Sequence, residues 1–213
     1  MREAVSQDEF LIDAASSLGL ALDLGQAAMC RNFLAELYRW NRRAGLTNIR
    51  AEDGPRLHLL DSLAVVPLIE GVVSLADLGS GAGLPGIPLS IALPALRVTL
   101  VESRPIRCSF LREVKRKLGL DNVDVLEQDA ARLEARGLHF DGVVSRAFRS
   151  PGRLLPMARG LLESGGRLVV MAGGGGGAGE EAAECAGLSF ETERVLRLPG
   201  GGERRRLQLF RRL

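Results

Sequence analysis

The stretch Asp77–Gly86, DLGSGAGLPG, places glycines at three alternate positions between an apolar, β-prone run and a segment with helical spacing. Glycine tolerates positive φ and allows a backbone to approach a ligand closely. The helix that follows begins with backbone N–H groups that have no helical partner and suit a polar ligand. A strand, a glycine turn and a helix in this order predict the nucleotide-binding corner of an α/β sheet.

Two cofactor patterns fit this stretch. Read from Gly81, it matches G-x-G-x-x-G, the dinucleotide fingerprint. Read from Asp77, it matches D-x-G-x-G-x-G, the loop of methyltransferases that use S-adenosylmethionine (SAM). Glu102 ends the next apolar run, at a distance from the loop where a carboxylate accepts hydrogen bonds from the ribose hydroxyls of either cofactor. The loop and this acid therefore leave SAM and NAD open.

Three further features favour SAM. Asp77 lies two positions before the first glycine, where its carboxylate orders the loop or meets the amino-acid end of SAM. Asp129 and the small residues Ala130 and Ala131 follow another apolar run, and they suit the amino group and the ring of an adenine. The chain then ends in a predicted hairpin over Leu188–Phe210 instead of a second nucleotide-binding half.

Apolar, β-prone segments alternate with helical patterns from Val72 onward. This alternation predicts an α/β fold, a mainly parallel sheet with helices on both faces. The preceding residues have helical spacing, so we divide the chain into a helical N-terminal extension, residues 1–70, on the RNA or substrate side, and a SAM-binding core, residues 71–213. Strands are expected at Val72–Leu78, Val98–Val101, Val123–Leu126, Gly142–Val144 and Leu168–Met171, and helices after capping boxes at Ser6–Glu9 and Asp23–Gln26 and at Arg56–Val66, Ile87–Leu93, Pro105–Leu118, Ala130–Arg136 and Pro151–Leu162.

Composition is that of an ordinary globular protein, with 46% hydrophobic and 25% charged residues. No apolar run reaches the ~20 residues of a membrane span, and the first residues include acids where a signal peptide would be basic. We therefore expect a cytoplasmic protein that does not bind membranes. The three cysteines are far apart and lie outside any Cys/His cluster, which predicts no metal site.

The basic residues form clusters, and all but two of the 28 are arginine. Such clusters suit a phosphate backbone, although an arginine bias across the whole sequence would produce them too. The phosphate contacts that we expect are Arg42, Arg43, Arg104, Arg107, Lys115 and Arg116.

With these residues assembled, the chain resembles the GidB/RsmG family, the bacterial small-subunit rRNA guanine-N7 methyltransferases. The resemblance runs from about Leu34 to the C-terminus. It rests on six motifs in order: WNRRAGLT (Trp40–Thr47), HLLDSL (His58–Leu63), DLGSGAGLPGIPL (Asp77–Leu89), FLREV (Phe110–Val114), FDGVVSRAF (Phe140–Phe148) and GER (Gly202–Arg204).

The resemblance implies a class I SAM-dependent methyltransferase fold, Rossmann-like, with a seven-stranded sheet that ends in an antiparallel hairpin. It implies SAM as methyl donor, S-adenosylhomocysteine as product, and 16S rRNA or the small ribosomal subunit as acceptor; we expect a monomer. Family SAM contacts correspond to Gly79, Leu84, Ala130, Ala131 and Arg146. The complete expected cofactor site is Asp77, Gly79, Ser80, Gly81, Leu84, Glu102, Ser103, Asp129, Ala130, Ala131 and Arg146.

Three positions depart from the family pattern. Gly45 replaces the second Asn of W-N-x-x-x-N-L-T, and Leu57 replaces the Arg before the His of the HLLDSL motif. Ala172 stands where relatives often have lysine. If that lysine contacts RNA or the target base, its absence changes the site.

N7 of guanine has an in-plane lone pair and no proton, so its methylation needs positioning rather than a general base. We assign positioning roles to Arg146 and Asp61. Arg146 would hold the SAM carboxylate or the target nucleotide, or else pair with Asp141 or Glu102 as a surface cation. Asp61 would accept from the amino edge of guanine, or else form a helix-surface pair with His58.

Trp40 lies on an apolar helical stripe, which favours a core position over stacking on a base. Three other functions stay open: a class I methyltransferase for another RNA or a small molecule, an NAD(H)-dependent oxidoreductase, and a non-catalytic RNA-binding protein.

Overall fold

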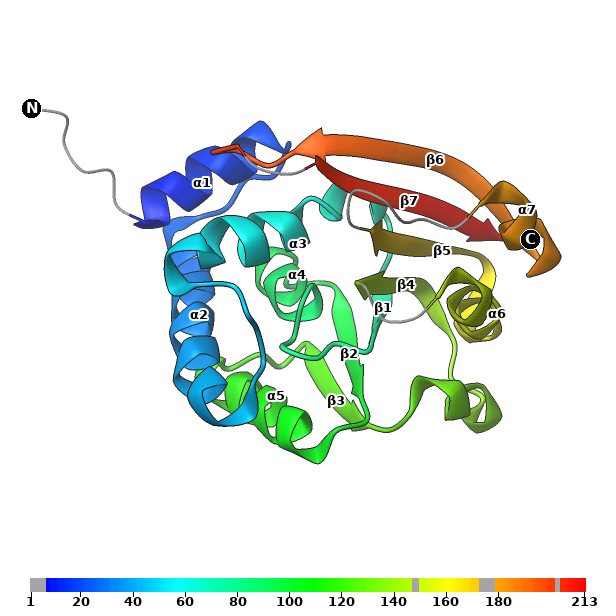
Figure 1. The fold of residues 1–213 in the computed structure, drawn as a ribbon, viewed down its shortest axis with the longest axis horizontal. Helices are drawn as coiled ribbons and strands as arrows, with labels where there is room; N and C mark the ends of the chain where they lie inside the picture. The colour runs from blue at the N-terminus through cyan, green and yellow to red at the C-terminus, as the bar shows by residue number, and fades with distance from the viewer. Residues whose placement is uncertain (1–6, 147–149, 173–178, 202–203) are drawn as a thin grey trace, which may run out of the picture.

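The computed structural model describes residues 7–146, 150–172, 179–201 and 204–213, and these form a seven-stranded sheet in the order β3-β2-β1-β4-β5-β7-β6 (Figure 1). The first five strands are parallel, and β7 is antiparallel to both of its neighbours. The predicted mainly parallel sheet with a C-terminal hairpin is confirmed. The strands are β1 (Ser74–Leu78), β2 (Arg97–Glu102), β3 (Val123–Glu127), β4 (Phe140–Arg146), β5 (Leu162–Ala172), β6 (Leu188–Arg197) and β7 (Arg204–Arg212).

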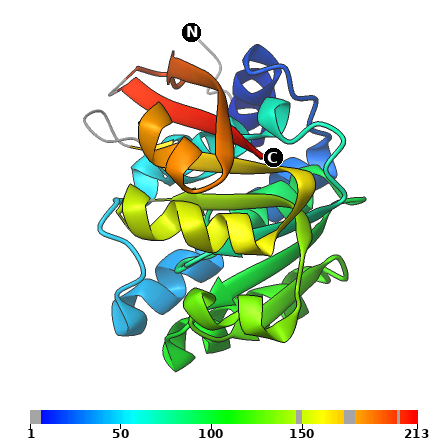
Figure 2. The same cartoon turned by 90° about the vertical axis from the view of Figure 1, so that its right-hand side faces the viewer.

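Helices cover both faces of this sheet (Figures 1 and 2). Successive side chains of a strand point to opposite faces, so the alternating buried residues of β5 enter two separate hydrophobic clusters. Val169 and Met171 join the cluster under the N-terminal helices, whereas Leu168 and Val170 join the one under the last helices. The helices are α1 (Gln7–Ser17), α2 (Leu24–Ala44), α3 (Asp61–Leu63), α4 (Gly86–Ala92), α5 (Pro105–Leu118), α6 (Pro151–Leu161) and α7 (Glu180–Cys185).

The N-terminal helices pack on the same face of the sheet as α4 and α5. Asp23 caps α2 through the predicted capping box, and the apolar stripe of this helix places Phe33 and Leu37 fully inside the protein. These side chains share one hydrophobic cluster with Leu89 of α4 and Phe110 of α5. The cluster therefore crosses the predicted division at residue 70, and the division itself stays a prediction.

Two expected helices are irregular. In place of one helix over Arg56–Val66, a π-helical turn (Pro55–Leu60) leads into α3, and a 3₁₀ turn (Val66–Leu68) follows. In place of one helix over Ala130–Arg136 there are two 3₁₀ turns, Ala130–Arg132 and Glu134–Arg136. Hydrogen bonds between residues three apart close both of these turns.

Two other predictions fall outside the described residues, the capping role of Ser6 and most of the glycine run Gly173–Gly179. None of the helices in the described part of the chain has the length and apolar character needed to cross a membrane.

Candidate active site

The glycine loop after β1 is tied to the end of β2. Gly79, Gly81 and Gly83 have φ angles of 71°, 55° and 79°, in the left-handed region that glycine adopts without strain. The backbone N–H groups of Gly79 and Ser80 donate to the carbonyl oxygen of Val101 at 2.9 and 3.0 Å. The predicted strand, glycine turn and helix are present, and the loop lies at the carboxyl edge of the sheet.

Asp77 is buried below this loop. Its Oδ2 atom accepts a hydrogen bond of 2.9 Å from the backbone N–H of Gly86, the first residue of α4. Burial raises the pKa of the Asp77 carboxyl to about 7, although the Gly86 N–H group and the charge of Arg146 act in the opposite direction. Asp77 thus fixes the junction between loop and helix, one of its two predicted roles.

Glu102, at the end of β2, is 5% exposed and holds the next turn. Its Oε1 atom accepts from the backbone N–H groups of Ser103 and Arg104, both at 2.8 Å, and its Oε2 atom accepts from Gly81 N–H at 3.1 Å. The guanidinium of Arg107 lies 3.6 Å from the same Oε2. Four groups therefore fix the carboxylate in the place expected of the ribose acceptor.

Asp129 begins the 3₁₀ turn after β3. Its carboxylate accepts a hydrogen bond of 3.0 Å from the N–H group of Ala131. Ala130 is buried, and Ala131 is exposed. Both alanines line a cavity of about 390 Å³ that reaches the first turns of α6, where Gly152 and Met157 contribute to its wall.

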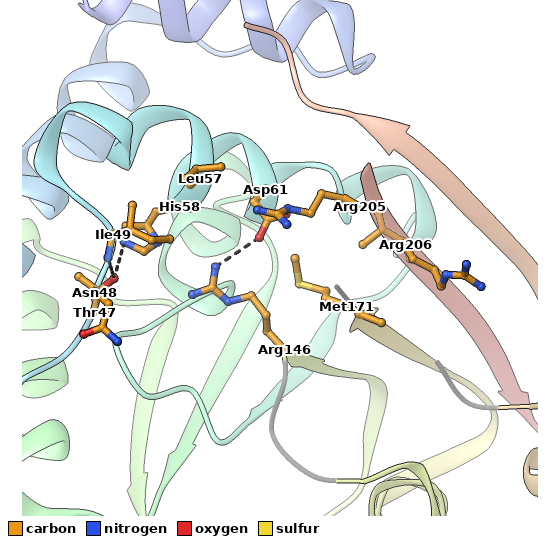
Figure 3. Close-up of a pocket in the computed structure, with 12 residues that line it drawn as sticks. Thr47, Asn48, Ile49, Leu57, His58, Asp61, Arg146, Met171, Arg205 and Arg206 are labelled. Atoms are coloured by element: carbon orange, nitrogen blue, oxygen red, sulfur yellow. Dashed lines mark hydrogen bonds and ion pairs between the residues drawn. The ribbon is translucent and has the colours of Figure 1, made fainter. Parts of the chain in front are cut away.

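A second cavity, of about 360 Å³, lies where β4, β5 and β7 meet the π-helical turn and α3 (Figure 3). Arg146 ends β4, Met171 lies near the end of β5, and Arg205 lies near the start of β7. Because β7 runs antiparallel, its first residues reach the edge at which the parallel strands end. This is the edge where open α/β sheets bind their ligands.

Asp61 is the carboxylate of this cavity. Its Oδ2 atom lies 3.3 Å from Nη1 of Arg146, and its Oδ1 atom lies 3.0 Å from Nε of Arg205. Asp61 is 6% exposed, and burial raises the pKa of its carboxyl despite the two guanidinium groups. The helix-surface alternative for Asp61 is wrong, because the side chain is buried and contacts two arginines.

His58 does not pair with Asp61 either. Its Nε2 atom lies 3.1 Å from Oγ1 of Thr47, and the residue is 1% exposed. Burial and the charge of Arg146 lower the pKa of His58 to about 4, so the ring is neutral near pH 7. A neutral imidazole in contact with a hydroxyl forms part of the wall and adds no charge to the cavity.

Arg146 connects the two halves of the edge. The alternative in which Arg146 pairs with Asp141 or Glu102 is wrong, because Asp141 accepts hydrogen bonds from Ser74 and Glu102 accepts one from the glycine loop. Arg146 contacts Asp61 instead. Its charge also opposes the rise that burial causes in the pKa of Asp77. Arg146 ends β4, which pairs with β1, so it lies between the strand that leads into the loop and the cavity of Asp61.

The residues expected to bind RNA differ in their surroundings. Arg42 and Arg43 are exposed at the end of α2, and Arg104 is exposed before α5. Arg107 lies against Glu102, at the candidate cofactor site rather than on an outer face. The remaining two lie on α5 and are paired with acids, Lys115 with Asp124 of β3 at 3.1 Å and Arg116 with Glu113 of the same helix at 3.0 Å.

All three departures from the family pattern now have a structural setting. Gly45 ends α2 in the left-handed conformation, with open space where a Cβ would lie. Asn is the other residue that commonly adopts this conformation, so the exchange conserves the backbone. Leu57 and Ala172 both line the cavity of Asp61.

Arg205 is the site residue that the sequence did not predict. The motif GER ends one position before it, and in a strand that begins with three consecutive arginines no pattern selects one of them. Only the insertion of β7 beside β5 brings it to Asp61. Trp40 packs against Phe110, with ring centroids 5.8 Å apart, which fits the expected core position.

The family match and the similar sequences carry the same description. A family model described as GidB, rRNA small subunit methyltransferase G, matches residues 26–207. The ribosomal RNA small subunit methyltransferase G of Stenotrophomonas maltophilia is 43% identical over 188 residues, 87% of each chain. The corresponding protein of Aromatoleum aromaticum is 40% identical, over 92% of this chain and 95% of its own.

Solved structures show the fold at lower identity. MtNAS in complex with MTA and tNA matches with a TM-score of 0.61 and 20% identity, over 97% of this chain and 75% of that one. TrmN from Thermus thermophilus matches with a TM-score of 0.54 and 19% identity, over 71% of this chain and 49% of that one.

Proposed function

The chain belongs to the GidB family, rRNA small subunit methyltransferase G, and from this premise we propose that it transfers the methyl group of SAM to N7 of a guanine in 16S rRNA. The fold is that of class I SAM-dependent methyltransferases. The substrate base, the methylated atom and the residue roles below are parts of the proposal. An enzyme with this substrate works where ribosomal subunits are, which places it in the cytoplasm.

One observation carries the proposal: Arg146 ends β4, the neighbour of the strand β1 that leads into the glycine loop, and its guanidinium contacts Asp61 in a separate cavity at the same edge of the sheet. The loop side has the glycines and Glu102, and the cavity side has Asp61. A methyl transfer needs a donor and an acceptor held next to each other, each in its own site. Two sites at the ends of the paired strands β1 and β4 meet this requirement.

The residues of the loop fit SAM. Glu102 is held by three backbone N–H groups, and Arg107 covers its Oε2 atom at 3.6 Å. We propose that a ribose hydroxyl takes the place of Arg107 there. Asp77 has a buried Oδ1 atom for which the described residues offer no hydrogen-bond donor. Acids at this edge also suit a ligand that carries a sulfonium and an ammonium charge.

The other expected contacts follow the same order along the ligand. Asp129 and Ala130 would lie at the adenine, and Arg146 at the amino-acid carboxylate. Leu84 is buried at the loop and would limit the space around the ligand. When bound, SAM supplies an activated methyl group on its sulfonium.

The protein's part in the reaction is to orient the acceptor and exclude water. N7 carries no proton, so no residue has to remove one. His58 is neutral and in contact with Thr47, which is consistent with a structural role in the cavity wall. We therefore assign the rate enhancement to positioning, the effect of holding two reactants in line at close distance.

RNA would reach this edge over the exposed arginines. Arg42, Arg43 and Arg104 have the exposure that phosphate contacts require. Lys115 and Arg116 would have to exchange their present acidic partners for phosphates. The proposed order of importance for RNA affinity therefore puts the first three above these two.

Ligand-dependent thermal unfolding tests the cofactor. A ligand at 100 times its Kd stabilises the native state by about 2.7 kcal/mol, which raises Tm by roughly 5–10 °C for a chain of this size. We expect this rise with SAM and with S-adenosylhomocysteine but not with NAD. A rise with NAD alone would contradict the proposal and support an oxidoreductase.

Nucleoside analysis of 16S rRNA tests the substrate. Deletion of the gene should remove one 7-methylguanosine, and the wild-type gene should restore it, whereas the Arg146→Ala gene should not. Unchanged 7-methylguanosine in the deletion strain would exclude this substrate. If the protein binds SAM but the deletion leaves 7-methylguanosine unchanged, a methyltransferase for another RNA or a small molecule would be favoured.

A further inference from the structure

We propose that Asp61 and Arg146 read the Watson–Crick edge of the target base and so select guanine over adenine. This inference rests on the proposed function and adds to it the groups that recognise the base. Both side chains line the cavity of about 360 Å³, and Figure 3 shows them directed toward one another.

The pair places a hydrogen-bond donor beside an acceptor. Nη1 of Arg146 and Oδ2 of Asp61 are 3.3 Å apart. Guanine has the complementary order along one edge: O6 accepts, and the neighbouring N1–H and N2 amino groups donate. Arg146 would donate to O6 while Asp61 accepts from N1–H and the amino group, because arginine only donates and an ionised carboxylate only accepts.

Adenine has the opposite order. Its N6 amino group donates where O6 of guanine accepts, and its N1 accepts where N1 of guanine donates. Adenine in the same position would set donor against donor and acceptor against acceptor. Buried polar groups without a partner cost about 1–3 kcal/mol each, so the pair would exclude adenine strongly.

The surroundings keep Asp61 oriented for this task. It comes from α3, Arg146 from β4 and Arg205 from β7, so three separate elements hold one carboxylate. A carboxylate has about four lone-pair sites, and each of the two oxygens contacts one arginine. Each oxygen therefore retains capacity for one donor from the base.

The cavity also suits a planar ring. Leu57, Met171 and Leu207 provide apolar wall next to the two charged groups. Enzymes that act on a base taken out of its stack bind it between apolar or aromatic side chains and read its Watson–Crick edge. The volume, about 360 Å³, falls within the ~300–1,000 Å³ of small-molecule sites.

The experiment compares two acceptor RNAs that differ in one group. One RNA carries guanosine at the methylated position, and the other carries inosine, which keeps N7, O6 and N1–H but lacks the 2-amino group. We measure kcat/KM for both with wild type, with Asp61→Asn and with the control Asp141→Asn. Asp141 is a carboxylate that accepts from Ser74, away from the cavity.

For wild type and for the control, kcat/KM for the guanosine RNA should exceed that for the inosine RNA by about tenfold or more. The reason is that a hydrogen bond to a charged group contributes at least about 1.4 kcal/mol. For Asp61→Asn, methylation of guanosine should fall at least tenfold and the ratio should fall to within about twofold of one. If methylation is too slow to measure, the ratio is taken from competitive binding of the two RNAs.

A structural role for Asp61 predicts a different result. Disturbance of Arg146 or of the fold would lower the values for guanosine and inosine alike, and a ratio unchanged from wild type would overturn the proposal. Failure of wild type to methylate the guanosine RNA at all would instead refute the proposed function. The two failures are therefore distinguishable.

Discussion

Asp77 and His58 are both buried, yet burial moves their pKa values in opposite directions. The pKa of Asp77 is raised to about 7, and that of His58 is lowered to about 4. A carboxyl whose pKa is raised on folding stabilises the folded state at low pH, and this contribution is lost as the pH rises toward 7. A lowered histidine pKa stabilises the fold above about pH 6.5 and loses this contribution as the pH falls toward 4.

Between about pH 4 and 6.5 the two contributions therefore oppose each other. The folded state binds one more proton than the unfolded state at Asp77 and one fewer at His58. In Asp77→Asn the histidine contribution remains alone, so the free energy of unfolding relative to wild type should rise with pH, by up to about 1.4 kcal/mol per unit. Urea unfolding at several pH values in this range measures the difference.

His58→Gln provides the opposite test. Its free energy of unfolding relative to wild type should fall as the pH rises over the same range, because only the Asp77 contribution remains. If the free energy of unfolding of either variant changes with pH in parallel with that of wild type, the substituted side chain does not titrate as its burial requires.

At the scale of elements, the packing of α4 on the sheet depends on the absence of a side chain at Gly86. A Cβ atom there would lie 2.3 Å from Cδ2 of Leu100 and 2.8 Å from Oδ2 of Asp77. Gly86→Ala should therefore lower the free energy of unfolding by about 1–3 kcal/mol, the range for overpacking. The substitution should also weaken SAM binding, because Asp77 precedes the glycine loop and accepts a hydrogen bond from Gly86 at the start of α4.

Gly152→Ala is the matched control, since Gly152 lies in the first turn of α6 with open space around its would-be Cβ. Alanine is preferred to glycine in a helix by about 0.5–1 kcal/mol, so this variant should be neutral or more stable. Denaturant unfolding compares the two. Equal effects would show that the close contact at Gly86 relaxes without cost.

Elements with a strong local signal could be predicted from the sequence. Pro105–Leu118 is a helix over the expected residues, because its periodic apolar face and Pro105 at its start agree with its packing. Ala130–Arg136 was also expected to be helical but forms 3₁₀ turns, since Asp129 caps the first turn and Gly137 ends the second in a left-handed conformation. The short helix Glu180–Cys185 was not predicted, because it has a single fully buried side chain, Ala183.

The site could be predicted only where its residues follow one another along the chain. The glycine loop and Glu102 have a fixed spacing, because one strand and one helix separate them. The contact of Asp61 with Arg146 and Arg205 joins residues far apart in sequence. Neither the burial of Asp61 nor its second arginine has a local signal, since both arise from the order of β4, β5 and β7 in the sheet.

At the scale of the whole molecule, one hydrophobic cluster extends from the N-terminal helices to the last strand. It includes Leu11 of α1, Leu37 of α2, Leu100 of β2 and Leu209 of β7. A core shared in this way predicts that residues 1–70 and 71–213 unfold together in a single transition. Separate domains would unfold in two.

Trp40 makes this prediction measurable, because it is the only tryptophan and contacts Phe110 across the division. Its fluorescence reports on α2, whereas far-ultraviolet circular dichroism reports on all helices and strands. The two signals should give the same denaturant midpoint for the wild-type protein.

Two matched core variants sharpen the test, since Leu37 and Leu155 are both fully buried but lie on opposite faces of the sheet. Leu37→Ala and Leu155→Ala should each lower the free energy of unfolding by about 2–5 kcal/mol. In a single cooperative unit both variants shift the Trp40 signal and the circular dichroism together. If the N-terminal extension unfolds separately, Leu155→Ala shifts the circular dichroism and leaves the Trp40 midpoint at its wild-type value. That result would separate the extension from the core, and the helical wall that holds Asp61 would then be free to open without loss of the sheet.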